Sequence, residues 1–174
     1  TAVAGSDYVR TSDSVMLSPG QTNAVIQIPV IGDRINEPSE SFFVQLTSAS
    51  NAVLGASVGR GTILNDDPVP SLSINDAAGV SEGNAGTADA AFVVALSSPS
   101  GQTITVDFST ADGTASASSD YVAQTGSLRF APGETSKTIL VAVRGDTQDE
   151  PNENFLVRLL NPSNATLSDD QGQA

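Results

Sequence analysis

The chain has 174 residues and contains no cysteine, histidine or tryptophan. Without cysteine it has no disulfide, no thiolate nucleophile and no cysteine-ligated zinc or iron–sulfur site. Without histidine it has no imidazole base and no histidine-ligated metal. Aromatic residues make up only 5% of the chain, which disfavours a platform for stacking nucleic-acid bases. The chemistry that remains is mainly that of carboxylates, hydroxyls and backbone carbonyls.

The chain also has few basic residues, with 7 Lys and Arg against 20 Asp and Glu, and its net charge is −13. Nucleic acids and anionic membrane surfaces attract basic patches, so we expect neither as a partner. No apolar run reaches the roughly 18 residues of a membrane span, so we expect no span either. Oxygen-rich acidic chains suit hard cations, which makes Ca²⁺ the expected cofactor.

An internal repeat organises the chain. Residues 1–61 align without a gap on residues 114–174, at a constant shift of 113, and 26 of the 61 aligned pairs are identical. The two tyrosines of the chain, Tyr8 and Tyr121, form one of these pairs. Self-similarity on this scale is typical of tandem domains, so we infer two units of about 110 residues each.

Neither unit is expected to be whole. We assign residues 1–67 to the C-terminal part of a first unit, residues 68–70 (Pro-Val-Pro) to a linker, and residues 71–174 to a second unit that lacks its last strand. The chain is therefore expected to be a piece of a longer array. Because incomplete sheets have exposed edges, the strand expected at 61–64 is a candidate to close a neighbouring sheet, in this chain or in another copy.

The secondary structure is expected to be strands throughout. Runs such as 92–96, 103–108 and 138–143 are rich in β-branched and apolar residues, and turn residues such as Pro132-Gly133 separate them. No segment has a sustained helical period. Short strands in units near 100 residues indicate an all-β fold, an antiparallel sandwich.

The order of several motifs resembles the Calx-beta repeat family. These motifs are Val-Ser-Glu-Gly at 80–83, Asp-Gly-Thr-Ala at 112–115, Ser-Asp-Tyr at 119–121, Phe-Ala-Pro-Gly-Glu-Thr at 130–135, Glu-Pro-Asn-Glu-Asn-Phe at 150–155 and Gly-Thr-Ile-Leu-Asn-Asp-Asp at 61–67. The resemblance implies immunoglobulin-like sandwiches of seven strands. It also implies calcium ligands in the distal loops, as in the sodium–calcium exchanger members of the family. Other members are spacers in large adhesion and surface proteins.

The densest acidic loop spans residues 146–153 and contains four carboxylates. Calcium takes six to eight oxygens from a flexible set of ligands, so such a loop suits it. Acids at the positions that match the family's ligands extend the set by resemblance. The full candidate set is Glu82, Asp120, Asp146, Asp149, Glu150 and Glu153, with Asp7, Asp33, Glu37, Glu40, Asp66 and Asp67 for the first unit.

Two features of the sequence weaken this expectation. The run of aspartates that precedes the Glu-rich stretch in dense calcium binders is reduced here to Asp146 and Asp33, and Arg34 puts a positive charge in the first loop. The alternative is a solvated acidic turn with no ion. Asp120 also has a structural interpretation, an Asx-type turn, and Tyr8 and Tyr121 are expected to be corner residues that anchor it.

The sequence thus favours a calcium-binding or calcium-stabilised structural or adhesion module of a larger repeat protein, secreted or on the cell surface. The alternative is a calcium-independent sandwich spacer that mediates protein–protein contacts. The expected partners are adjacent units of the chain, another copy by strand complementation, and a surface protein or carbohydrate. Paired carboxylates also occur in glycosidases, but here they recur in a loop without an evident sugar platform, so we expect no enzyme.

Overall fold

The computed structural model describes residues 1–174. The chain divides into two compact units. Unit 1 comprises Thr1–Arg34 and Pro38–Asp66, and unit 2 comprises Ile35–Glu37 and Asp67–Ala174. All regular elements are strands, and none is a helix. The prediction of an all-β sandwich fold is confirmed.

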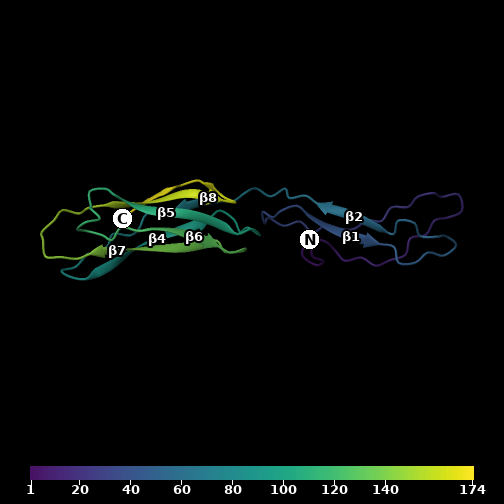
Figure 1. Ribbon diagram of the computed structural model, residues 1–174, viewed down its shortest axis with the longest axis horizontal. Coiled ribbons are helices and arrows are strands. Elements are labelled where there is room, and N and C mark those ends of the chain that lie inside the picture. Colours follow the sequence, from purple (N-terminus) through teal and green to yellow (C-terminus); the bar gives the residue numbers. More distant parts are fainter. The chain divides into compact units, whose positions relative to one another are not determined.

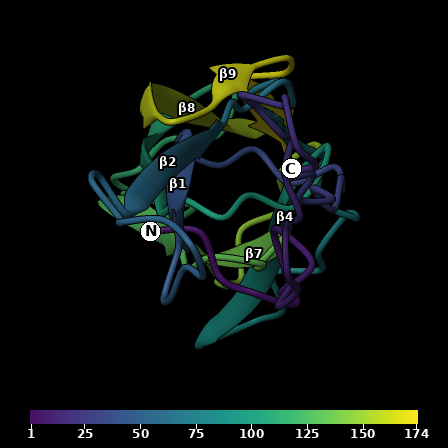
Figure 2. The same cartoon turned by 90° about the vertical axis from the view of Figure 1, so that its right-hand side faces the viewer.

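Unit 2 is a sandwich of two four-stranded sheets, with strand orders β10-β8-β5-β6 and β7-β4-β3-β9. All its strand pairs are antiparallel except the short parallel pair of β3 and β9. Figures 1 and 2 show β8 and β7 on opposite sides of this unit. The strands are β3 (Ser71–Ile74), β4 (Thr87–Leu96), β5 (Ile104–Asp112), β6 (Thr125–Phe130), β7 (Ser136–Arg144), β8 (Phe155–Ser163), β9 (Thr166–Leu167) and β10 (Gln171–Gln173).

The core of unit 2 follows from residue alternation along its strands. Successive side chains of a strand point to opposite faces, so every second residue enters the space between the sheets. In β4 the buried positions include Ala90, Phe92 and Val94, and in β8 they include Val157 and Leu159. All the buried hydrophobic side chains of the structure belong to unit 2. Burial of this apolar surface is the main term that stabilises the sandwich.

Unit 1 has a two-stranded sheet of β1 (Glu40–Gln45) and β2 (Val58–Ile63). The pairing of Gln45 with Val58 in this sheet repeats, at the shift of 113, the pairing of β8 with β10 in unit 2. An aromatic stack repeats as well. The ring centroids of Tyr8 and Phe42 are 4.7 Å apart, and those of their unit 2 counterparts, Tyr121 and Phe155, are 4.5 Å apart.

The repeat does not extend to every strand. Residues 12–17 and 23–31 correspond to β6 and β7 but are not strands, apart from a single bridge at Val30. In unit 2, β6 pairs with β5 and β7 pairs with β4. Residues 1–66 contain no counterpart of β4 or β5, so within this structure these two segments have no ladder to join.

The closing strand differs from the sequence expectation. It was expected at 61–64, but β2 begins at Val58 and ends at Ile63. Because of this earlier start, its counterpart in unit 2 lies partly inside the chain as β10, which pairs with β8. Unit 2 therefore has the first residues of the strand that the sequence interpretation left out.

Candidate metal site

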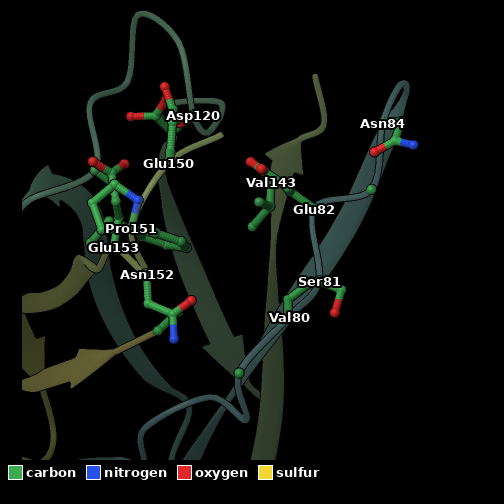
Figure 3. Close-up of a pocket in the computed structure, with 15 residues that line it drawn as sticks. Val80, Ser81, Glu82, Asn84, Asp120, Val143, Glu150, Pro151, Asn152 and Glu153 are labelled. Atoms are coloured by element: carbon green, nitrogen blue, oxygen red, sulfur yellow. The ribbon is translucent and has the colours of Figure 1, made fainter. Parts of the chain in front are cut away.

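Three carboxylates converge at one end of unit 2. Oxygens of Asp120, Glu150 and Glu153 all lie within 4.8 Å of one another. Asp120 ends the loop between β5 and the bridge at Tyr121, whereas the two glutamates come from the loop between β7 and β8. Figure 3 shows the three side chains gathered on one side of a pocket. We call these three residues the acidic cluster.

The pocket beside the acidic cluster has a volume of about 600 Å³. Its opposite wall is the segment before β4, which contributes Ser81, Glu82 and Asn84 (Figure 3). Asn152 adds an amide on the side of the acidic cluster. The apolar lining residues are Val80, Ala115, Val143, Pro151, Phe155 and Ala174. The pocket is therefore polar at its acid-bearing walls and apolar where it meets the core.

Gly145 brings the two walls together at the end of β7. Its amide donates to the carbonyl oxygen of Gly86 at 3.1 Å. A Cβ placed on Gly145 would clash with the carbonyl oxygen of Glu82 and would lie 2.6 Å from that of Gly83. Only glycine allows this approach of two backbones. The residue after it, Asp146, is thereby brought near the pocket.

Asp120 is held by the turn that precedes it. Its Oδ2 accepts a hydrogen bond from the amide of Ser116 at 2.7 Å, and its own amide donates to the Ser116 carbonyl oxygen at 2.9 Å. The carboxylate of Asp120 therefore bonds to its own loop, but it does so to the amide four residues earlier rather than two residues later, so this is not the Asx-type turn that was expected. The same residue belongs to the acidic cluster. The structural and ligand interpretations of Asp120 are compatible.

Tyr121 anchors the same loop. Its side chain is buried, and its hydroxyl donates to Oδ1 of Asp112 at 2.6 Å. Burial, followed by the hydrogen bond to Asp112 and the charge of that carboxylate, raises the pKa of Tyr121 to about 12. This is the corner role expected for the tyrosine, and it leaves the hydroxyl protonated at neutral pH.

The charges of the acidic cluster perturb one another. Desolvation raises the pKa of Glu150, and the charges of Asp146, Asp120 and Glu82 raise it further. Desolvation also raises the pKa of Glu153, which is then stabilised in its protonated form by a hydrogen bond to Asp120. The pKa of Asp120 is lowered, first by the Ser116 amide, then by the Ser119 side chain. The cluster thus holds a proton more readily than isolated glutamates do, and a cation would replace that proton.

The other candidates of the second unit lie at different distances from this cluster. Glu82 lines the pocket, and Asp146 is near enough to raise the pKa of Glu150. Oδ1 of Asp146 also accepts a hydrogen bond from the Gln148 amide at 2.6 Å. Asp149 is exposed and is not part of the acidic cluster.

The candidates of the first unit correspond by the repeat. Asp7 and Glu40 are half-buried in unit 1, where Asp33 and Asp66 are exposed. Glu37 and Asp67 belong to unit 2 but do not line the pocket described above. The carbonyl oxygen of Asp67 accepts a hydrogen bond from the side-chain Nδ2 of Asn36 at 2.9 Å, so this backbone already has a structural role.

Sequence reasoning did not single out the amides and the hydroxyl of the pocket. Ser81, Asn84 and Asn152 are common loop residues, and their only signal is a position beside Glu82 or inside the 146–153 loop. Their oxygens suit a hard cation, as do those of the carboxylates. Each carboxylate of the acidic cluster places one oxygen within 4.8 Å of the others, and calcium takes its oxygen ligands from a flexible set, so the residues present fit a calcium ion.

Comparison with known proteins identifies the family. The model of the Calx-beta domain matches residues 1–69 and, a second time, residues 65–173. Sodium/calcium exchanger 1 of Canis lupus familiaris is 36% identical over 196 residues, which covers 97% of this chain and 19% of the exchanger. Sodium/calcium exchanger 3 of Mus musculus is 31% identical over 198 residues, with 97% and 20% covered. The chain thus spans about a fifth of the length of these relatives.

A solved structure agrees with this result. The apo form of the Calx CBD1 domain aligns with a TM-score of 0.50 and 27% identity, and the alignment covers 61% of this chain and 96% of that domain. No helix in the structure has the length and hydropathy needed to cross a membrane.

The relatives also overturn one expectation. An extracellular or cell-surface location was expected, in a secreted or adhesion protein, but the matching proteins are sodium/calcium exchangers. The expectation was wrong because it relied on composition and on other members of the family, and neither of these determines where a protein is located. The two family matches, the repeated register and the sandwich of unit 2 show that the chain belongs to the Calx-beta family and contains two such segments in tandem.

Proposed function

We propose that the chain is a calcium-binding module of a larger protein and that the acidic cluster of unit 2 holds the ion. The observation that carries the proposal is the convergence of Asp120, Glu150 and Glu153 within 4.8 Å. Three carboxylates this close repel one another when empty. The pKa values of both glutamates are raised first by desolvation and then by the charges of neighbouring acids. A divalent cation removes the repulsion, so it should bind and order the loops.

Two further observations support calcium as the cation. The cluster has only oxygen ligands, which are those of hard cations, and it lies on loops rather than on rigid strands. Calcium tolerates irregular and flexible geometry, whereas Mg²⁺ demands near-ideal octahedral geometry and dehydrates reluctantly. The relatives are named sodium/calcium exchangers, which supports a role in which the module senses calcium and regulates a larger protein.

Calorimetric titration of the chain with calcium tests this proposal. We expect saturable binding at the cluster, weaker binding of Mg²⁺, and a loss of affinity in Glu150→Gln. Asp89→Asn is the matched control, because Asp89 is an exposed acid of β4 outside the pocket. No heat of binding at millimolar calcium would leave the calcium-independent spacer as the function. That the chain is not an enzyme stays a prediction.

A second copy of the chain is the partner that unit 1 favours. β1 pairs only with β2, whereas its counterpart β8 has β10 on one side and β5 on the other. On this second edge Ser41 bonds to Thr1 and Ala2, but beyond Ser41 no strand of residues 1–174 pairs with it. This part of β1 includes the exposed Phe43, and exposed edges pair with other strands. Sedimentation should therefore show concentration-dependent association, and a monomer at every concentration would count against it. A surface-protein or carbohydrate partner stays a prediction.

A further inference from the structure

One threonine ties the two halves of the acidic cluster to each other. The amide of Asn154 donates to Oγ1 of Thr114 at 2.8 Å, and the amide of Ala115 donates to the carbonyl oxygen of Asn154 at 2.9 Å. Asn154 directly follows Glu153. Ser116, two residues after Thr114, donates its amide to Asp120. We call the two hydrogen bonds between 114–115 and Asn154 the Thr114 bracket.

The Thr114 bracket therefore joins two carboxylates that come from different loops. Asp120 is fixed to the Ser116 amide, and Glu153 is one peptide bond away from the amide that Thr114 holds. The path between the two backbones runs from the Asp120 carboxylate through the Ser116 amide and the Thr114 hydroxyl to the Asn154 amide. It therefore sets how close the backbone that carries Glu153 lies to the Asp120 loop before any ion binds.

Gly113 makes the bracket possible. A Cβ at Gly113 would clash with the side chain of Asn154 and would lie 2.5 Å from its carbonyl oxygen. Gly113 thus allows the backbone to approach Asn154 closely, and Thr114 provides the hydroxyl that accepts the hydrogen bond from the Asn154 amide. The Asn154 side chain contributes less, because its Oδ1 accepts from the Thr114 amide at 3.4 Å.

Unit 1 supplies an independent instance. The counterparts of Thr114 and Asn154 are Thr1 and Ser41, and the Ser41 amide donates to Oγ1 of Thr1 at 3.2 Å. The Ala2 amide donates to the Ser41 carbonyl oxygen at 3.0 Å, as Ala115 does to Asn154. The side chain changes from Asn to Ser between units, whereas the threonine stays. Both units therefore share a hydrogen bond from a backbone amide to a threonine hydroxyl.

We propose that Thr114 is a positioning residue for the calcium site, whose hydroxyl holds Glu153 against Asp120 through the Asn154 amide. This inference rests on the proposed function. The mutual repulsion in the cluster would otherwise separate the loops in the absence of calcium, and the bracket opposes that separation. Groups that orient metal ligands typically change metal affinity by about 10–100-fold when they are removed.

The test compares calcium affinity across four variants of the full chain. Thr114→Val removes the hydroxyl at nearly constant shape and should raise the calcium Kd about tenfold. Thr114→Ser keeps the hydroxyl and should bind within about twofold of the unmodified chain. Asn154→Ala keeps the amide and should also stay within about twofold. Thr125→Val, an exposed threonine of β6 away from the pocket, is the matched control.

The outcomes separate the two proposals. No calcium binding by the unmodified chain would overturn the proposed function, and this inference with it. Binding by the unmodified chain with an unchanged Kd in Thr114→Val would overturn the inference alone. A fall in the unfolding midpoint in chelator without a change in Kd would also overturn it, because that result is the mark of a purely structural threonine.

Hydrogen exchange of the unmodified chain tests the same inference without requiring that any variant fold. In chelator, the Asn154 amide should exchange its hydrogen slowly, because the bracket is formed before calcium binds. Exchange at the rate of an open loop in chelator, with protection only after calcium is added, would overturn positioning by a preformed contact.

Discussion

At the scale of single residues, the site depends on two carboxyl groups whose pKa values are shifted in opposite directions. Glu153 is stabilised in its protonated form by Asp120, whereas Asp120 is stabilised in its charged form by the Ser116 amide. A proton and a calcium ion therefore compete for the same pair of groups. This competition links affinity to both the charge of Glu153 and the pH.

Glu153→Gln should have opposite effects with and without calcium. In calcium, the variant loses a charged ligand, so the calcium Kd should rise at least about tenfold. In chelator, it removes a repelling charge, so the unfolding midpoint should stay or rise. Calorimetry and thermal unfolding measure the two effects. A variant that lost stability in chelator as well would show that Glu153 is a structural acid.

Calcium affinity should fall as the pH is lowered. The pKa values of Glu150 and Glu153 are raised, so these groups take up protons at a pH where an unfolded chain would not yet do so. In chelator, this uptake adds stability as the pH falls through the raised values. The stabilisation that the charged Asp120 contributes is lost as the pH falls from the pKa of the unfolded chain through the lowered pKa of the folded chain. Titrations at about pH 7.5 and about pH 5 should therefore give a higher calcium Kd at the lower pH. Equal affinities would contradict proton–calcium competition.

The residues that the sequence could predict are those with a chemical signature. Asp120, Glu150 and Glu153 stand out because they are acids at repeated positions, and the structure brings them together. Thr114 has no such signature, since its role depends on a contact with residue 154, 40 positions away. Contacts of this kind follow from the fold and are not visible in local sequence.

At the scale of elements, the two walls of the pocket meet because a glycine, Gly145, directly follows β7. The loop between β7 and β8 carries Glu150 and Glu153, and the segment before β4 carries Glu82. Gly145 lets the backbone of one approach the other. The geometry of the site is thus a property of two loops and one close contact.

Gly145→Ala should push the segment that contains Glu82 away from the end of β7. We expect weaker calcium binding, by about tenfold, and a loss of about 1–3 kcal/mol of stability from overpacking. Gly32→Ala is the matched control, because Gly32 is the counterpart in unit 1 and a Cβ there meets nothing within 4 Å. Calorimetry and urea unfolding compare the pair. Equal behaviour of the two variants would contradict the close-approach argument.

Strand positions were predictable where apolar and polar residues alternate clearly. They were less predictable where pairing with a neighbouring strand determines the ends of the strand. β7 was expected at 138–143 and spans Ser136–Arg144. The closing strand was displaced by three residues at its start, because its edges are set by pairing with β1 rather than by its own composition. Residues 12–17 also depend on pairing. They form no strand because residues 1–66 contain no counterpart of β5, the strand with which β6 pairs.

At the scale of the whole molecule, the apolar core is confined to unit 2. Phe92 is fully buried there, whereas Phe43 of unit 1 is 65% exposed. Stability of the chain should therefore come mainly from the sandwich of unit 2. The setting of the chain in a larger protein was the part that sequence reasoning misjudged, since acidity suits secreted, surface and other proteins equally well.

Phe92→Ala should lower the free energy of unfolding by about 3–5 kcal/mol, because it leaves a cavity between the two sheets. Phe43→Ala should change it by less than about 0.5 kcal/mol, as expected for a surface position. Urea unfolding with intrinsic fluorescence or circular dichroism measures both. Similar losses for the two variants would show that unit 1 buries its own core.

The central claim is that calcium binds the folded chain at the acidic cluster. Thermal unfolding in chelator and then in millimolar calcium tests it most directly, with a Glu150→Gln, Glu153→Gln double variant beside the unmodified chain. A ligand that binds only the folded state adds about 2.7 kcal/mol at one hundred times its Kd. The account predicts a higher midpoint in calcium for the unmodified chain and no shift for the variant. The same midpoint in both conditions for the unmodified chain would contradict it.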